Sequence, residues 1–159
     1  MIPLGIALAT SMRIGRAVGE GRIDALRRIG FGSIFTAVAF ALVFTVVFAV
    51  GGPLIVSGFT HEADVAKLAA ELLIIAAIFQ IFDGGQAVAS GALRGLTDVK
   101  IPTLLTFISY WVMALPTGYY LGVQRNDPHG VWIGLAVGLG ATYLMLSWRF
   151  YRKTAPSSA

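Results

Sequence analysis

The sequence predicts an all-α integral membrane protein, a bundle of four full transmembrane helices preceded by part of another helix. Three observations support this fold class. Only 13% of the 159 residues are charged, about half the share that soluble domains carry. The mean hydropathy is high, at +0.79. The long apolar runs lack the alternation of a transmembrane barrel, so helices are the structure that satisfies their backbone hydrogen bonds in lipid.

Four apolar runs are long enough to cross a bilayer, which takes about 20 helical residues. They are residues 31–55, 68–93, 101–123 and 131–151. The opening run, residues 1–12, is too short to span, and it has neither the basic start nor the cleavage site of a signal peptide. We interpret it as the end of a helix that begins outside this sequence.

The basic residues predict the orientation of the bundle. Ten of the twelve lie in alternate connections, where the positive-inside rule places the cytoplasm. The C-terminus is then cytoplasmic as well. The net charge of +4 is therefore a topology signal, and we expect the lipid bilayer, not nucleic acid, as the partner of these residues. They are Arg13, Arg16, Arg22, Arg27 and Arg28 before the first span, Arg94 and Lys100 between the second and third, and Arg149, Arg152 and Lys153 after the last.

Small residues at helical spacing predict close helix contacts. Gly91 and Gly95 form one pair separated by three residues, and Gly134 and Gly138 form another. Such pairs let two helix backbones approach each other in a membrane. We expect packing surfaces at these positions.

Several kinds of chemistry are excluded. The chain has no cysteine, so it has no disulfide, thiolate metal site or cysteine nucleophile. Its two histidines, His61 and His129, lie in separate polar segments without a second ligand at metal-binding spacing. No nucleophile–base pair or paired-carboxylate site is present. We therefore expect neither an enzyme nor a metal site.

Asp83 is the acidic residue placed deepest in a predicted span, about 22 Å from one end and about 15 Å from the other. A carboxylate at that depth costs on the order of 3 kcal/mol, so it should face the bundle interior or a water-filled cavity. Gln80, Gln86 and Ser90 share its helix face and form a polar stripe. A carboxylate there can bind a proton, Na⁺ or a cationic substrate. The alternative is a structural hydrogen bond to a neighbouring helix.

The third span contains a proline and several aromatic residues. Pro116 removes one backbone hydrogen bond and predicts a helix kink, which is either a moving bend or a fixed one. Tyr110 and Trp111 are candidates to line a cavity for flat organic cations. For Tyr119 and Tyr120 we favour a place in the aromatic belt at the membrane surface.

Several stretches, taken in series over nearly the whole chain, resemble multidrug and toxic compound extrusion (MATE) transporters. Residues Ile2–Gly19 are similar to the end of the second helix of one lobe. Residues Gln80–Gly95, followed by Asp98, Lys100 and Pro102, look like the tenth helix and the loop after it. Residues Tyr110–Tyr119 and Gly130–Leu135 look like helices eleven and twelve.

The resemblance, which is to the NorM-like branch, implies that residues 1–159 are part of a C-terminal lobe, roughly helices 8–12. It implies a bacterial inner-membrane antiporter that exports organic cations, with Na⁺ or H⁺ as the coupling ion and no other cofactor. Asp83 corresponds to the acidic residue of that lobe's cation site. Phe79 stands where some relatives carry a tyrosine near the ion.

The family has twelve helices in two lobes, with substrate held between them. The resemblance therefore implies that the N-terminal lobe and the first helices of the same transporter are missing partners, and that the chain is inactive alone. Two alternatives remain open. One is a related lipid or polysaccharide flippase, which should carry basic residues at membrane depth. The other is a small membrane scaffold that oligomerises through its glycine faces and transports nothing.

Overall fold

The computed structural model describes residues 1–58, 63–125 and 129–155, and within these ranges every regular element is a helix. The predicted all-α fold class is confirmed. The helices are α1 (Ile2–Gly19), α2 (Ile23–Ser57), α3 (Ala63–Gly95) and α6 (Gly130–Lys153), together with one composite rod made of α4 (Lys100–Ile108), the π-helical segment η1 (Ser109–Ala114), α5 (Leu115–Tyr119) and the π-helical segment η2 (Tyr120–Gln124).

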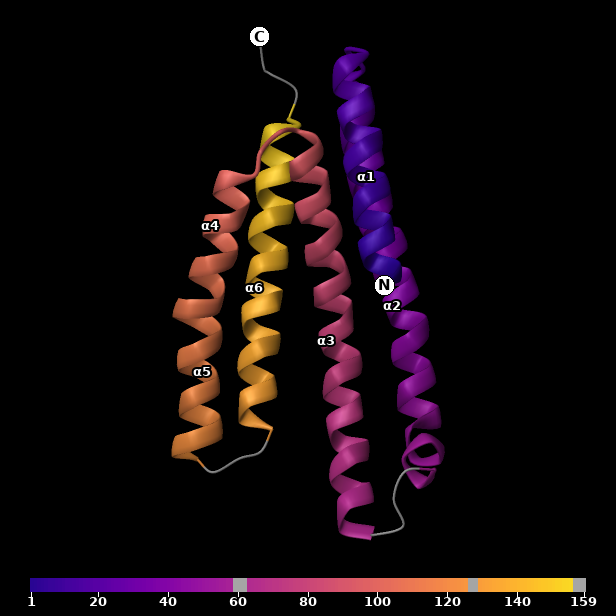
Figure 1. Ribbon diagram of the computed structural model, residues 1–159, viewed down its shortest axis with the longest axis vertical. Coiled ribbons are helices and arrows are strands. Elements are labelled where there is room, and N and C mark those ends of the chain that lie inside the picture. The colour runs from indigo at the N-terminus through magenta and orange to yellow at the C-terminus, as the bar shows by residue number, and fades with distance from the viewer. Residues whose placement is uncertain (59–62, 126–128, 156–159) are drawn as a thin grey trace.

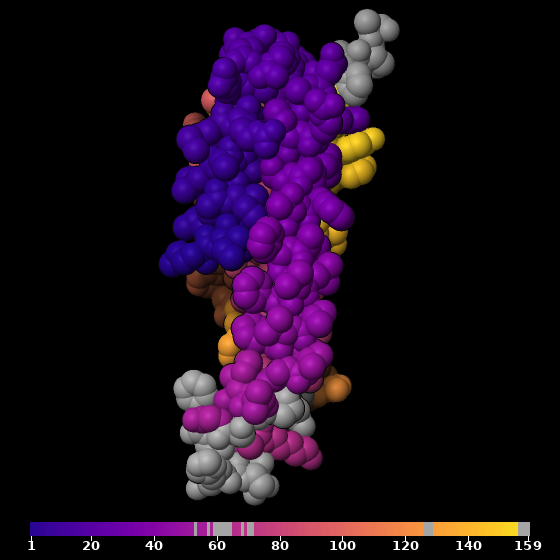
Figure 2. All heavy atoms as spheres, turned by 90° about the vertical axis from the view of Figure 1, so that its right-hand side faces the viewer, coloured from indigo at the N-terminus to yellow at the C-terminus, as the bar shows by residue number. Residues whose placement is uncertain are grey.

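Helix α3 lies at the centre of the arrangement (Figure 1) and packs against α1, α2 and α6. The composite rod α4–η2 packs mainly along α6 and forms the outer side of the bundle. Figure 2 shows α1 beside the first half of α2, which continues well beyond it. The bundle thus consists of a three-helix group and a two-rod group that meet at α3 and α6.

Four segments of the described chain are long and apolar enough to cross a membrane: Ile23–Gly52, Val65–Gly95, Lys100–Gln124 and Gly130–Lys153. They contain nearly all of the four predicted spans. The protein is therefore a multi-pass membrane protein. Its apolar surface agrees with this, because many large hydrophobic side chains on all four spans are exposed.

The predicted boundaries at the start of the chain were wrong. The first helix does not end at residue 12 but continues to Gly19, and α2 begins at Ile23 rather than near residue 31. Both helices include arginines outside the apolar runs. The long side chain of arginine can reach water from a residue whose backbone is helical. The connection is reduced to three residues, Glu20 to Arg22. Gly21 makes the tight turn with a φ of +69°, which glycine adopts without strain.

The fold brings the three basic clusters to one end of the bundle. The end of α1, the start of α2, the α3–α4 connection and the end of α6 all lie at the top of Figure 1. This arrangement is the one that the alternation of charge predicts. Which side of the membrane this end faces stays a prediction.

The predicted glycine contacts are confirmed. Gly91 lies directly on the Ala7 backbone of α1, and a side-chain carbon at Gly95 would come within 2.6 Å of the Ser11 carbonyl oxygen. On the other side of the bundle, a side-chain carbon at Gly134 would lie 2.8 Å from the Ala114 carbonyl oxygen. The small residues therefore set how closely α3 approaches α1 and how closely α6 approaches the rod.

Pro116 lies between two π-helical segments, η1 and η2. The N–H of Leu115, immediately before it, donates to the Tyr110 carbonyl oxygen five residues back. The wider turn relieves the clash that a proline ring makes with the preceding helical carbonyl. The predicted disturbance of this span thus takes the form of widened turns, and whether it acts as a hinge stays a prediction.

An ion-pair cluster joins the α3–α4 connection to the end of α6. The Asp98 Oδ2 atom lies 2.7 Å from Arg149 Nε and 3.1 Å from Lys153 Nζ. The Asp98 side chain is only 6% exposed. Its burial opposes ionisation, but the hydrogen bonds from Arg149 and Lys153 outweigh burial and lower the pKa of Asp98 below its ordinary value of 3.8.

This cluster predicts a specific pH dependence. Because the pKa of Asp98 is lower in the folded protein, its stabilising effect is complete well above pH 3.8 and is lost as the pH falls through the folded pKa. Asp98→Asn should lower stability at pH 7 by about 1–3 kcal/mol, since it removes charge-assisted hydrogen bonds. Thermal unfolding in detergent at several pH values should show this difference shrinking below pH 3.8. A constant difference, or an equal loss in the exposed control Asp24→Asn, would contradict the assignment.

Candidate cation site on the central helix

Asp83 lies on α3 at the edge of the surface that packs against other helices. Its neighbours Gly84 and Gly85 take the buried positions, against Pro3 of α1 and Tyr143 of α6 respectively. Asp83 itself is exposed and borders a cavity of about 520 Å³ between α3 and the first residues of α1. Met1, Pro3 and Leu4 line this cavity from the start of the chain, and Phe79 and Gln80 line it from α3.

The polar stripe divides around Asp83. Gln80 lines the same cavity, and it also lines a smaller one of about 300 Å³ against Phe40 and Phe44 of α2. Gln86 faces the composite rod, where it interacts with Tyr110. Ser90 is half-buried and does not line the Asp83 cavity. The structure therefore groups Gln80 with Asp83 and separates Ser90 from them.

Tyr110 approaches the stripe from η1 of the composite rod. Its hydroxyl group interacts with the Gln86 side chain and, electrostatically, with the Asp83 carboxylate. The Gln86 Oε1 atom is buried and has no hydrogen-bond partner in the described part of the chain. Buried polar atoms are rarely left unpaired, so this oxygen is free to accept a hydrogen bond from water or a bound molecule.

Tyr110 also reaches a second, largely apolar groove, of about 440 Å³. Trp111 and Tyr119 line it from the rod, and Val131 and Leu135 line it from α6. Aromatic rings over an apolar floor attract flat organic cations. Tyr110 thus borders both the groove and the surroundings of Asp83, which the separation of these residues in sequence did not indicate.

The remaining sequence candidates lie away from these cavities. Pro116 is exposed and does not line the groove. Tyr120 is exposed near the end of the rod, where the Arg125 guanidinium lies 5.3 Å from its ring centre. His61 lies outside the described residues. Among the residues that the structure does describe, no three His, Asp or Glu side chains gather as a metal site.

The matches to a family model and to curated relatives agree with each other. A family model described as MatE matches residues 1–120. A "Probable multidrug resistance protein NorM" of Xylella fastidiosa is 42% identical over 151 residues, which cover 94% of this chain and 32% of that protein. A "Multidrug resistance protein NorM" of Burkholderia vietnamiensis is 42% identical over 161 residues, covering 98% of this chain and 35% of that protein. The chain spans about a third of the length of the curated relatives it matches.

Two solved structures share the fold. One is a crystal structure of the eukaryotic MATE transporter AtDTX14, with a TM-score of 0.82 at 22% identity, covering 96% of this chain and 36% of that one. The other is an inward-facing multidrug resistance MATE family transporter of the MOP superfamily, with a TM-score of 0.85 at 20% identity, covering 99% of this chain and 37% of that one. The described bundle therefore matches about a third of each of these larger structures in shape.

Proposed function

The chain belongs to the MatE family, and on that premise we propose that residues 1–159 form part of the C-terminal lobe of an antiporter that exports organic cations. The relatives at about 42% identity are named as multidrug resistance proteins, which supports drug export. One observation carries the coupling part of the proposal. An exposed carboxylate, Asp83, stands at a cavity beside the centre of a membrane-spanning helix.

The proposed mechanism rests on competition for Asp83. A proton or Na⁺ on the carboxylate removes its negative charge and with it the attraction for an organic cation. Release of that ion restores the charge, which a substrate cation in the adjoining space then compensates. A charge left unpaired at membrane depth is costly, so the empty and ionised state is disfavoured. The ion and the drug therefore bind in turn, as antiport requires.

Tyr110 is proposed to connect the carboxylate with the aromatic groove. It interacts with Gln86 and Asp83 on one side and lines the groove with Trp111 on the other. Occupancy of the Asp83 site by an ion would change the electrostatic surroundings of the phenol. The groove, in turn, offers ring faces to the substrate. This places ion and drug in neighbouring spaces on α3 and η1.

The other parts of the transporter are proposed to come from outside these 159 residues. The chain covers about a third of its relatives, which leaves room for the N-terminal lobe and the first helices of this lobe. On this proposal the chain does not transport alone. The protein lies in a bacterial inner membrane, and its basic end, with the C-terminus, faces the cytoplasm.

Export by the polypeptide that carries this sequence tests the proposal. We expect a C-terminal tag at the native gene to label a membrane product well above 16.9 kDa. Cells that make this product should expel ethidium at least several times faster than cells without it, and an ionophore that collapses the H⁺ and Na⁺ gradients should stop the difference. A tagged product of that size with no effect on ethidium efflux would refute drug export. A product near 16.9 kDa that expels ethidium would refute the need for further helices.

A further inference from the structure

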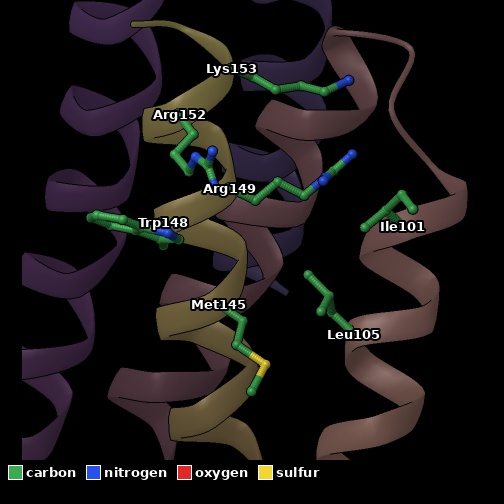
Figure 3. A pocket seen from close by; sticks show the side chains of 7 residues that line it. All are labelled: Ile101, Leu105, Met145, Trp148, Arg149, Arg152 and Lys153. Carbon is green, nitrogen blue, oxygen red and sulfur yellow. The ribbon is translucent and has the colours of Figure 1, made fainter.

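A pocket with a basic rim opens at the charged end of the bundle, between α4 and α6 (Figure 3). Its volume is about 540 Å³. Figure 3 shows Arg149 and Lys153 extending from α6 toward α4, while Ile101 and Leu105 point back from α4. The pocket lies far along α6 from the aromatic groove, and none of its lining residues belongs to the Asp83 cavity.

The rim holds more positive charge than the protein neutralises. Asp98 pairs with both Arg149 and Lys153, so one carboxylate faces two cations. Arg152, the third basic residue of the rim, is in none of the ion pairs among the described residues. The net charge of these four side chains is therefore positive by two units, which favours an anion in the pocket.

Hydrogen-bond donors also remain available on the rim. Arg149 gives its Nε–H to Asp98, which leaves the four N–H groups of its two terminal nitrogens. Because Asp98 is buried, it holds the Arg149 side chain in place before any ligand arrives. Guanidinium groups positioned in this way match the oxygens of a phosphate group, which they bind through paired hydrogen bonds.

The floor of the pocket is apolar and runs into the membrane. Met145 lies about 12 Å along α6 from Lys153, toward the membrane centre. Leu105 lines the same depth from α4. Trp148, which is 62% exposed, stands between the charged rim and the floor, as tryptophan does at the headgroup level of a bilayer.

We propose that this pocket binds an anionic phospholipid, with the headgroup phosphate on Arg149 and Arg152 and an acyl chain along Leu105 and Met145. A basic pocket between transmembrane helices is the kind of site that holds acidic lipid headgroups. The apolar floor distinguishes a lipid from free phosphate, because a free ion would gain nothing from it. The lipid would tie α4 to the end of α6 at the membrane surface.

Lipid titration of the purified polypeptide that carries this sequence, in dodecyl maltoside, tests this site, with bound lipid counted by native mass spectrometry. We expect dioleoylphosphatidylglycerol to bind at least tenfold more tightly than dioleoylphosphatidylcholine. Arg152→Gln should weaken phosphatidylglycerol binding about fivefold, the effect of one basic residue near an anionic surface. The control Arg94→Gln makes the same charge change at the same end, at an exposed residue that does not line the pocket, and should leave binding unchanged.

Three results would overturn the proposal. They are equal binding of the two lipids, equal effects of Arg152→Gln and Arg94→Gln, and displacement of the lipid by inorganic phosphate at equimolar concentration. The last would identify free phosphate as the ligand. Circular dichroism establishes that each variant keeps its helices. If Arg152→Gln loses them, Lys153→Gln replaces it in the same comparison.

Discussion

Asp83→Asn, made in the polypeptide that carries this sequence, is expected to reduce ion-coupled drug export at least tenfold. Asparagine keeps the size and polarity of aspartate but cannot take up a proton or neutralise a cation. The variant should remain folded, because Asp83 is exposed at a cavity and is not part of the buried helix contacts. Ethidium efflux from energised cells, normalised to the amount of protein in the membrane, measures the effect.

Asp24→Asn is the matched control for this prediction. It makes the same chemical change at an exposed residue in the first turn of α2, near the basic end of the bundle. Its efflux should stay close to that of the unaltered protein. Full efflux in Asp83→Asn would remove Asp83 from the coupling mechanism. Equal losses in both variants would show that the effect is not specific to the cavity.

Gly91→Ala is expected to separate α1 from α3. A methyl group at this position would meet the carbonyl group and the Cα atom of Ala7, and backbone atoms cannot turn aside as a flexible side chain does. Overpacking of this kind costs about 1–3 kcal/mol. In thermal unfolding of the purified polypeptide that carries this sequence, the apparent melting temperature should fall by several degrees.

Gly32→Ala provides the comparison on α2. A methyl group there has no atom within 4 Å, and alanine favours a helix more than glycine does. Its melting temperature should be unchanged or higher. If both variants unfold at the same temperature, the close contact of α1 with α3 through Gly91 does not contribute to stability.

Hydropathy was enough to predict the helical bundle and its four spans, because each span is a long apolar stretch of helical backbone, including the third, where α-helical and π-helical segments alternate. The glycine spacing also predicted real contacts, such as Gly91 on Ala7. The same reasoning misplaced the end of α1. It treated Arg13 and Arg16 as part of a loop, whereas both lie on the exposed side of a continuing helix. Apolar content marks the part of a helix inside the lipid and not where its backbone ends.

Hydropathy and residue spacing could not predict contacts between residues that lie far apart in the sequence. In the sequence, Asp98 is an acidic residue in a connection and Arg149 is a basic residue near the C-terminus. Their ion pair forms only because α4 and α6 pack together. The approach of Tyr110 to Gln86 has the same origin, since the residues lie on different spans. The widened turns around Pro116 follow from its ring, yet the sequence predicts only that some disturbance occurs there.

Counter-movement of ions is the most direct test of the proposed antiport. The polypeptide that carries this sequence is placed in liposomes that have no H⁺ or Na⁺ gradient. An organic cation such as ethidium is then added outside, and the H⁺ and Na⁺ concentrations inside are measured. Coupled exchange predicts that drug entry drives one of these ions outward, and that Asp83→Asn stops this ion movement while Asp24→Asn does not. Drug entry with no movement of either ion, or ion movement that persists in Asp83→Asn, would contradict the proposed role of Asp83.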